Sequence, residues 1–162
     1  MTMDINILSG YGTYTLLLRV KKQVTVKIGS LGKQTFPVGY YIYTGSAMGR
    51  GASLKNRIAR HLRKEKRCFW HIDYILENEN VSVEAVVAAE TSQKVECEIN
   101  QHIRTEMGAK VQVKGFGASD CQKNCDSHLL FFPDAENVDW LVQKLVAGFM
   151  LVPGVLAVHV IR

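Results

Sequence analysis

Basic side chains crowd into one short stretch of the chain, where they could contact phosphates. Eight Lys and Arg residues and a single acidic residue, Glu65, lie between Arg50 and Arg67. This stretch carries a charge of +7, whereas the rest of the chain carries −2. A basic stripe on a slightly acidic body is the usual electrostatic footprint of a nucleic-acid partner. The sequence therefore predicts binding to nucleic acid.

The basic stretch is expected to form a helix that arranges these charges on one face. Ser53 can serve as the N-cap, and helix-forming residues without a breaker continue from Leu54 to about Lys66. Successive residues of a helix are about 100° apart, so this helix would have two faces. The apolar face holds Leu54, Ile58 and Leu62, and His61 lies at its border. The basic face holds Arg57, Arg60, Lys64 and Arg67. We expect Arg60, Lys64 and Arg67 to follow a nucleic-acid backbone. A merely solvated face is the alternative.

A second group of residues, further along the chain, has a spacing seen in metal sites. Cys121, Cys125 and His128 follow one another as Cys-x3-Cys-x2-His. Structural zinc takes four ligands. The sequence offers no evident fourth ligand apart from Asp120 or Asp126, so zinc is not favoured.

The hydrophobic pattern around these residues predicts a mixture of strands and helices. Alternating or continuously apolar runs predict strands at 13–20, 24–28, 39–43, 81–89, 128–132 and 155–161. Helical periodicity predicts helices at 54–66, 71–78, 93–106 and 136–150, the third of them capped by Ser92. The first three strands are expected to form a meander. The whole chain, 1–162, is therefore expected to be one α+β domain in which helices flank a small antiparallel or mixed β-sheet.

Three pieces of the sequence then line up in a characteristic order. Gly12-Thr13-Tyr14 opens the first strand, Tyr43-Thr44-Gly45 closes the third, and Arg57 and His61 follow on the next helix. This set resembles the GIY-YIG nuclease superfamily, with Thr in place of Ile at the centre of both tripeptides. The resemblance implies a GIY-YIG-like fold, and the 29-residue step from Tyr14 to Tyr43 implies an insertion between the two strands.

The resemblance continues beyond this core. The segments 70–74 and 115–129 are similar to a branch of the superfamily that also occurs fused to endonuclease III-like repair enzymes. The core covers about 10–108, the branch-specific extension covers 109–133, and a C-terminal helix and strand at 134–162 are not placed by the resemblance.

The resemblance implies a metal-dependent endonuclease that hydrolyses phosphodiester bonds, with DNA repair or processing as the favoured role. It implies that Tyr14 and Tyr43 orient or deprotonate water or bind phosphate, and that Arg57 stabilises the extra negative charge of the reaction. One Mg²⁺ or Mn²⁺ ion is expected on Glu96 in preference to Glu98, because a single carboxylate with phosphate and waters is a normal arrangement for Mg²⁺.

Further positions complete the candidate site. Gly45 allows close backbone approach, and Ser46 offers a weaker phosphate contact than the lysine of some members. His61 is expected to bond a tyrosine hydroxyl or a phosphate, or else to be a buried helix histidine. Secondary candidates from the branch resemblance are His71, Asp73, Ser119, Asp120 and His128. Because His71 and Asp73 are two residues apart on a helix, at least one of them is expected to be structural.

Composition limits the other classes of function. With 47% hydrophobic and 22% charged residues, the chain is ordinary globular rather than disordered. Its start has no signal-peptide pattern, and its longest uncharged run, 145–161, is broken by Gly and Pro and too short to span a membrane. We therefore expect a cytoplasmic protein without membrane contact. Two alternatives to the nuclease remain: a non-catalytic nucleic-acid-binding module, and an interaction domain whose apolar segment 138–161 binds a second copy or a repair protein.

Overall fold

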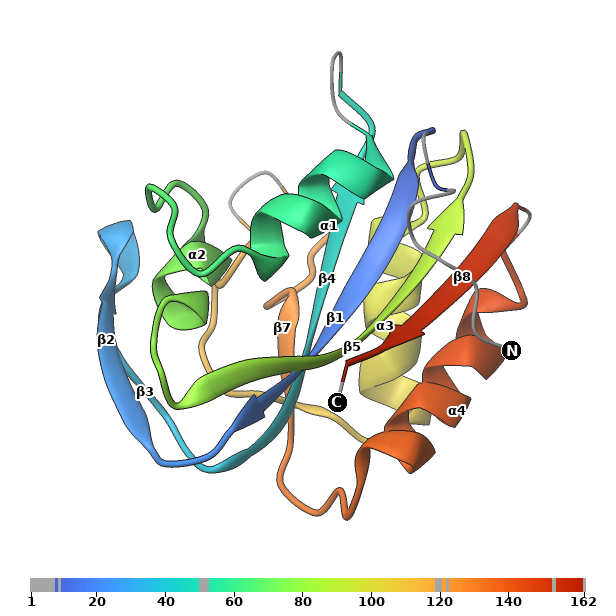
Figure 1. The fold of residues 1–162 in the computed structure, drawn as a ribbon. Helices are drawn as coiled ribbons and strands as arrows, with labels where there is room; N and C mark the ends of the chain where they lie inside the picture. Colours follow the sequence, from blue (N-terminus) through green and yellow to red (C-terminus); the bar gives the residue numbers. More distant parts are fainter. Residues whose placement is uncertain are drawn as a thin grey trace.

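The computed structural model describes residues 8, 10–49, 53–118, 121, 123–152 and 154–161. Its main element is a six-stranded sheet in which every neighbouring pair is antiparallel (Figure 1). In spatial order its strands are β6 (Lys110–Val111), β7 (Leu129–Phe132), β4 (Gly39–Ala47), β1 (Gly12–Val20), β5 (Val81–Glu90) and β8 (Val155–Val160). The predicted α+β class with helices flanking an antiparallel sheet is confirmed.

A separate two-stranded sheet stands between β1 and β4 in the sequence. β2 (Val24–Ile28) and β3 (Gly32–Phe36) form this hairpin, joined by the 3-10 turn η2 (Gly29–Leu31). The expected meander of the first three strands is therefore wrong, because β2 pairs with β3 and leaves β1 to pair directly with β4 over nine residues. That direct pairing places Tyr14 opposite Gly45.

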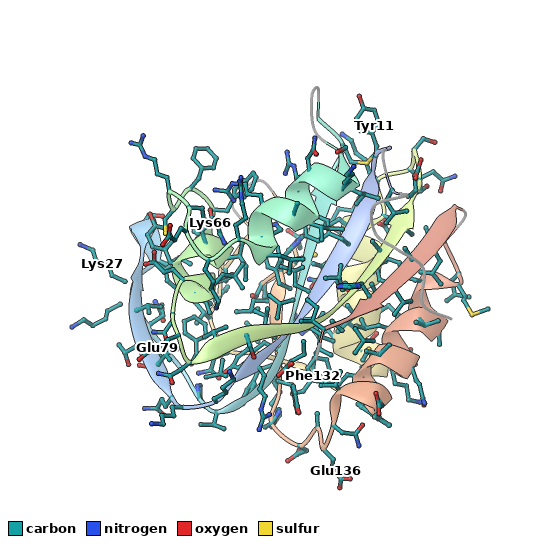
Figure 2. All side chains as sticks on the ribbon, in the orientation of Figure 1. Tyr11, Lys27, Lys66, Glu79, Phe132 and Glu136 are labelled. Carbon is teal, nitrogen blue, oxygen red and sulfur yellow. The ribbon has the colours of Figure 1, made fainter. Side chains whose placement is uncertain are left out.

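Both faces of the main sheet are buried, and they carry two different sets of apolar side chains. Leu16 and Leu18 of β1 belong to one core and Leu17 to the other, as expected from alternation along a strand. The first core is covered by α1 (Leu54–Leu62) and α2 (His71–Leu76), and the second by α3 (Glu96–Glu106) and α4 (Val138–Phe149) (Figure 1). Side chains fill the space between the sheet and the helices (Figure 2).

The helix of the basic stretch is shorter than predicted. Ser53 caps α1 as expected, with its hydroxyl accepting from the Asn56 amide at 3.1 Å. The helix ends at Leu62 rather than near Lys66, and Arg63 is extended. The Lys66 ammonium donates to the carbonyls of His61 and Arg63, so it satisfies carbonyls that the helix end leaves unpaired. The predicted four-residue basic face is therefore wrong, because Lys64 and Arg67 lie beyond the helix.

The other helices also differ from prediction at their ends. α2 stops two residues early, and α3 begins at Glu96 instead of residue 93. Ser92 does not cap α3, because the chain turns just before it, where the Thr91 hydroxyl accepts from the Gln93 amide at 3.2 Å. α4 begins after Asn137, whose side chain accepts from the Trp140 amide at 2.8 Å.

The C-terminal region completes the sheet and its second core. β8 pairs with β5, and the α4 side chains Leu141, Leu145 and Phe149 are buried. Trp140, by contrast, remains exposed on α4. Among the described residues, no helix combines the length and the apolar character needed to cross a membrane.

Candidate active site and metal cluster

A cleft of about 490 Å³ lies where the paired strands β1 and β4 meet α1, the start of α3 and the loop before β7. The sequence-predicted residues that line it are Tyr14, Tyr43, Gly45, Ser46, Arg57, Glu96 and His128. Trp70, Cys97, Gly117, Cys121 and Lys123 also contribute to its walls. Residues that are far apart in the sequence thus converge on one concave surface.

Gly45 is required by the way in which Tyr14 packs. The two residues are direct partners across β1 and β4. A Cβ atom built on Gly45 would stand 2.6 Å from the Tyr14 hydroxyl oxygen and 2.7 Å from its ring carbon Cζ. Such distances are below any van der Waals contact, so the Tyr14 ring occupies the space that a side chain at position 45 would need.

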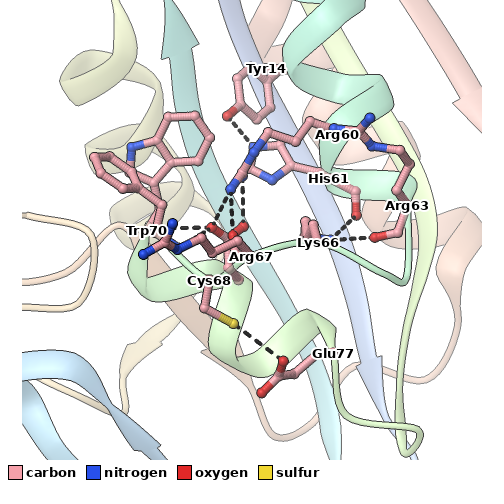
Figure 3. Close-up of polar contacts among 11 residues, drawn as sticks. Tyr14, Arg60, His61, Arg63, Lys66, Arg67, Cys68, Trp70 and Glu77 are labelled. Carbon is pink, nitrogen blue, oxygen red and sulfur yellow. Dashed lines mark hydrogen bonds and ion pairs between the residues drawn. The ribbon is translucent and has the colours of Figure 1, made fainter.

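His61 lies behind Tyr14, buried in the first core. Its Nε2 atom is 2.6 Å from the Tyr14 hydroxyl oxygen (Figure 3). Burial lowers the pKa of His61 to about 3, although the nearby Asp73 charge acts in the opposite direction. Burial also raises the pKa of Tyr14 well above its ordinary value, and Tyr43 adds to this. At neutral pH the pair is therefore a phenol bonded to an uncharged imidazole.

Arg57 is held against the wall of the cleft by two contacts. Its Nη1 atom donates to the Ser46 carbonyl at 3.1 Å, and its guanidinium carbon lies 4.9 Å from the centre of the Trp70 ring. The Arg60 guanidinium also lies over this ring, at 4.4 Å. Sequence reasoning missed Trp70 as a site residue. The available signal was an aromatic residue directly after the basic stretch.

Asp73 is buried and organises the turn that presents Trp70. Its carboxylate accepts two hydrogen bonds from the Arg60 guanidinium, both with N–O distances of 2.9 Å, and it also accepts from the amides of Phe69 and Trp70. Burial acts to raise the pKa of Asp73, but these bonds outweigh it and hold the pKa below its usual range. Arg60 is thus engaged within the chain.

The remaining members of the predicted basic face, Lys64 and Arg67, differ in their contacts. The Lys64 ammonium donates to the carbonyls of Leu76 and Val81, at 3.4 and 3.0 Å, and so ties the chain after α1 to the start of β5. Arg67 is exposed. Arg60 and Lys64 thus have partners within the chain, and the Arg67 carbonyl accepts from Arg60 Nη2 at 3.1 Å.

His71 positions the loop that closes one side of the cleft. Its Nδ1 atom accepts from the Gly117 amide at 2.8 Å. Gly117 has a φ of +63°, and a Cβ there would stand 3.2 Å from the Tyr43 ring. Both His71 and Asp73 therefore make structural contacts. Ser119 and Asp120 lie outside the described residues.

Glu96 faces the cleft from the first turn of α3. Its side chain is 29% exposed, and its Oε2 atom lies 3.3 Å from Nδ1 of the buried His128. Burial raises the pKa of Tyr43, as it does that of Tyr14, and the Glu96 charge acts in the same direction on both. Glu98 also lines the cleft, but it pairs with Lys123 at 2.9 Å, and its side chain is 53% exposed.

Three sulfurs and one imidazole gather at the edge of the cleft. Cys97, Cys121, Cys125 and His128 each offer a ligand atom, and these atoms all lie within 4.8 Å of one another. The cluster could hold a metal ion. Cys97 is the fourth candidate ligand, which the sequence did not reveal. It lies on α3, 24 residues before Cys121, and the fold brings its sulfur to the loop.

Comparison with known proteins gives a single result. A family model described as a domain of unknown function, DUF123, matches residues 13–151. No curated protein and no solved structure matches the chain. The match includes all the cleft residues described above.

Proposed function

The chain belongs to the DUF123 family, whose description names no activity, and we propose that the protein is a metal-dependent endonuclease of the GIY-YIG type. Its substrate would be nucleic acid, with DNA favoured, and its role DNA repair or processing. The observation that carries this proposal is the convergence of Tyr14, Tyr43, Arg57 and Glu96 on one cleft. Phosphodiester hydrolysis needs an oriented water, a cation for the developing charge and fixed geometry, and this set supplies all three.

Arg57 is suited to stabilise the phosphoryl group in the transition state. Its guanidinium has five N–H donors in a planar fork, which matches phosphate oxygens better than a lysine does. The bond to the Ser46 carbonyl and the Trp70 ring fix the fork before substrate arrives. Such preorganisation is what makes a charged donor effective in catalysis.

The Glu96 carboxylate fits a divalent ion of the Mg²⁺ type. It is partly exposed at the cleft wall, accepts hydrogen bonds only, and leaves room beside it for waters and a phosphate. Such an ion would supply Lewis-acid stabilisation of the developing charge, and it would offset the Glu96 charge that adds to the effect of burial in raising the pKa of both tyrosines. Glu98 is a weaker candidate because Lys123 already neutralises it.

The two tyrosines have different surroundings, which suggests different roles. The bond to His61 fixes the direction of the Tyr14 hydroxyl, whichever atom carries the proton. We assign Tyr14 to orienting the attacking water, with its remaining lone pair turned toward the cleft. Tyr43 stands on the neighbouring strand and is assigned to contacting the phosphate.

The proposal is tested by replacing Arg57 and measuring cleavage. Arg57→Ala should reduce cleavage of single-stranded, flapped and duplex oligonucleotides by about 10²–10³-fold in Mg²⁺ or Mn²⁺, the usual effect of removing one transition-state donor. Arg63→Ala is the matched control, because Arg63 is an exposed arginine just after the same helix. Circular dichroism checks that both variants are folded. Near-wild-type cleavage by folded Arg57→Ala would overturn the assignment.

A non-catalytic binding module is the second candidate. It is favoured by the burial that raises the pKa of Tyr14 and Tyr43, because a tyrosine that is harder to deprotonate is a poorer base toward water. Tight binding of these oligonucleotides without cleavage in either metal would support that module over the nuclease.

A further inference from the structure

We propose that Cys97, Cys121, Cys125 and His128 bind one Zn²⁺ ion as a structural Cys3His site. This site is distinct from the divalent ion at Glu96 and does not depend on the nuclease proposal. A set of three thiolates and an imidazole selects zinc over Mg²⁺, which prefers oxygen ligands. Four protein ligands close the coordination sphere, which is the pattern of a structural rather than a catalytic zinc.

The separations between the ligand atoms are close to those around tetrahedral zinc. With Zn–S bonds of about 2.3 Å and Zn–N bonds of about 2.0 Å, neighbouring ligand atoms stand about 3.6–3.8 Å apart. The sulfurs of Cys97 and Cys121 are 3.5 Å apart, and the Cys97 sulfur is 4.0 Å from Nε2 of His128. All four atoms therefore need to shift by no more than about an ångström to meet a common ion.

The histidine of the cluster is already oriented for this role. Its Nε2 atom faces the sulfurs, and its Nδ1 atom lies 3.3 Å from the Glu96 carboxylate and 3.4 Å from the Thr44 carbonyl. A zinc-bound histidine almost always donates its other N–H to a carboxylate or a carbonyl. The His128 backbone is also fixed, because its amide donates to the Phe116 carbonyl at 2.8 Å and its carbonyl accepts from the Thr44 amide at 3.0 Å.

A zinc ion at this site would have a structural role, because its ligands come from two separate segments. Cys97 is on α3, whereas Cys121 and Cys125 belong to a polar loop. Among the described residues, exposed side-chain bonds already join this loop to α3, such as Gln101 to the Lys123 carbonyl and Glu98 to Lys123. An ion between them ties the loop to α3 and keeps His128 beside Glu96. Zinc would in this way hold the wall of the candidate active site without taking part in the reaction.

The site is tested by metal analysis of the full chain, purified without chelators. The bound zinc should be close to one ion per chain, and replacing it with Co²⁺ should give the intense visible bands of tetrahedral thiolate-bound cobalt. Cys121→Ser should lose both signals. Cys68→Ser is the matched control, because Cys68 is a partly buried thiol outside the cluster, bonded to Glu77, and it should keep both.

A further variant leaves the four zinc ligands in place and alters the hydrogen-bond partner of one of them, His128. Glu96→Gln should still bind zinc, but about 10–100-fold more weakly, as expected when a partner of a ligating histidine is altered. Wild-type protein with neither zinc nor a cobalt spectrum would overturn the proposal, and so would a cobalt spectrum that persists in Cys121→Ser. A disulfide between Cys97 and Cys121, detected by mass spectrometry of the native protein, would overturn it as well. None of these measurements uses nucleic acid, so their failure would leave the nuclease proposal standing.

Discussion

Adding a single methyl group at Gly45 should displace Tyr14 and disturb the candidate site. The new Cβ atom would lie 2.6 Å from the Tyr14 hydroxyl oxygen, whereas ordinary contacts begin at 3.4 Å. The hydroxyl must therefore retreat by about 0.8 Å, the difference between those two distances. Tyr14 is only 2% exposed, so its ring cannot swing into solvent, and the shift must come from its bond to His61 or from the surrounding core.

The expected cost of Gly45→Ala combines two effects. Overpacking of a filled core destabilises by about 1–3 kcal/mol. Losing the Tyr14–His61 bond would leave a buried polar group unpaired, which costs about 1–3 kcal/mol more. We therefore expect the free energy of unfolding to fall by about 2–6 kcal/mol. Cleavage should fall as well, because the hydroxyl assigned to orienting water has moved.

Gly49→Ala is the matched control for this experiment. A Cβ on Gly49 would meet nothing within 4 Å, and the residue is four positions further along the same segment. Its replacement should leave stability unchanged or raise it by about 0.4–1 kcal/mol through the lower entropy of the unfolded chain. Urea unfolding monitored by circular dichroism measures both variants. If Gly45→Ala is as stable as Gly49→Ala, the packing of Tyr14 described above is wrong.

Three further predictions concern the metal carboxylate, the buried histidine and the exposed arginine. Glu96→Gln should reduce Mg²⁺-dependent cleavage by about 10²-fold or more, as for loss of a main source of transition-state stabilisation, while Glu98→Gln should have little effect; a dead Glu98 variant would place the ion elsewhere. His61 is neutral in the fold but charged in the unfolded chain between pH about 3 and about 6.5, so stability should fall as pH drops below about 6.5. His61→Gln should flatten this fall in urea unfolding at several pH values, whereas His102→Gln should not, and equal slopes in both variants would exclude His61 as the cause. Arg67→Gln should flatten the salt dependence of log K for oligonucleotide binding by about 0.7–0.9 if it contacts one phosphate, and an unchanged slope between 50 and 200 mM salt would show that it contacts none.

Five strands of the central sheet could be predicted from sequence because their apolar runs are long and well bounded, whereas the two-residue β6 has no such run. Their pairing could not be predicted in full. The alternating pattern of Val24, Val26 and Ile28 fits any antiparallel neighbour, and nothing local tells whether that neighbour is β1 or the following segment. The ends of α1 and α3 depended on particular side-chain bonds, those of Lys66 and Thr91, which override helix propensity.

A motif names Tyr14, Tyr43 and Arg57, and all three line one cleft, whereas their roles in catalysis stay predictions. Contacts between residues that are distant in sequence could not be predicted. Charge alone suggested that Arg60 faces solvent, although a buried carboxylate thirteen residues later takes it up. Cys97 has no local spacing signal, so its place beside the other sulfurs appears only when α3 and the loop are brought together.

Glu96 and Cys97 are consecutive residues in the first turn of α3, about 100° apart around its axis. Glu96 belongs to the candidate active site, and Cys97 belongs to the cluster of three cysteines and His128. An inserted or deleted residue between Thr91 and Val95 would rotate both side chains together, whereas a substitution can alter one and spare the other. Length changes in this short connection should therefore be far less tolerated than its exposed position suggests. For protein engineering, the segment 91–95 acts as a fixed spacer, in contrast to the usual freedom of surface connections to vary in length.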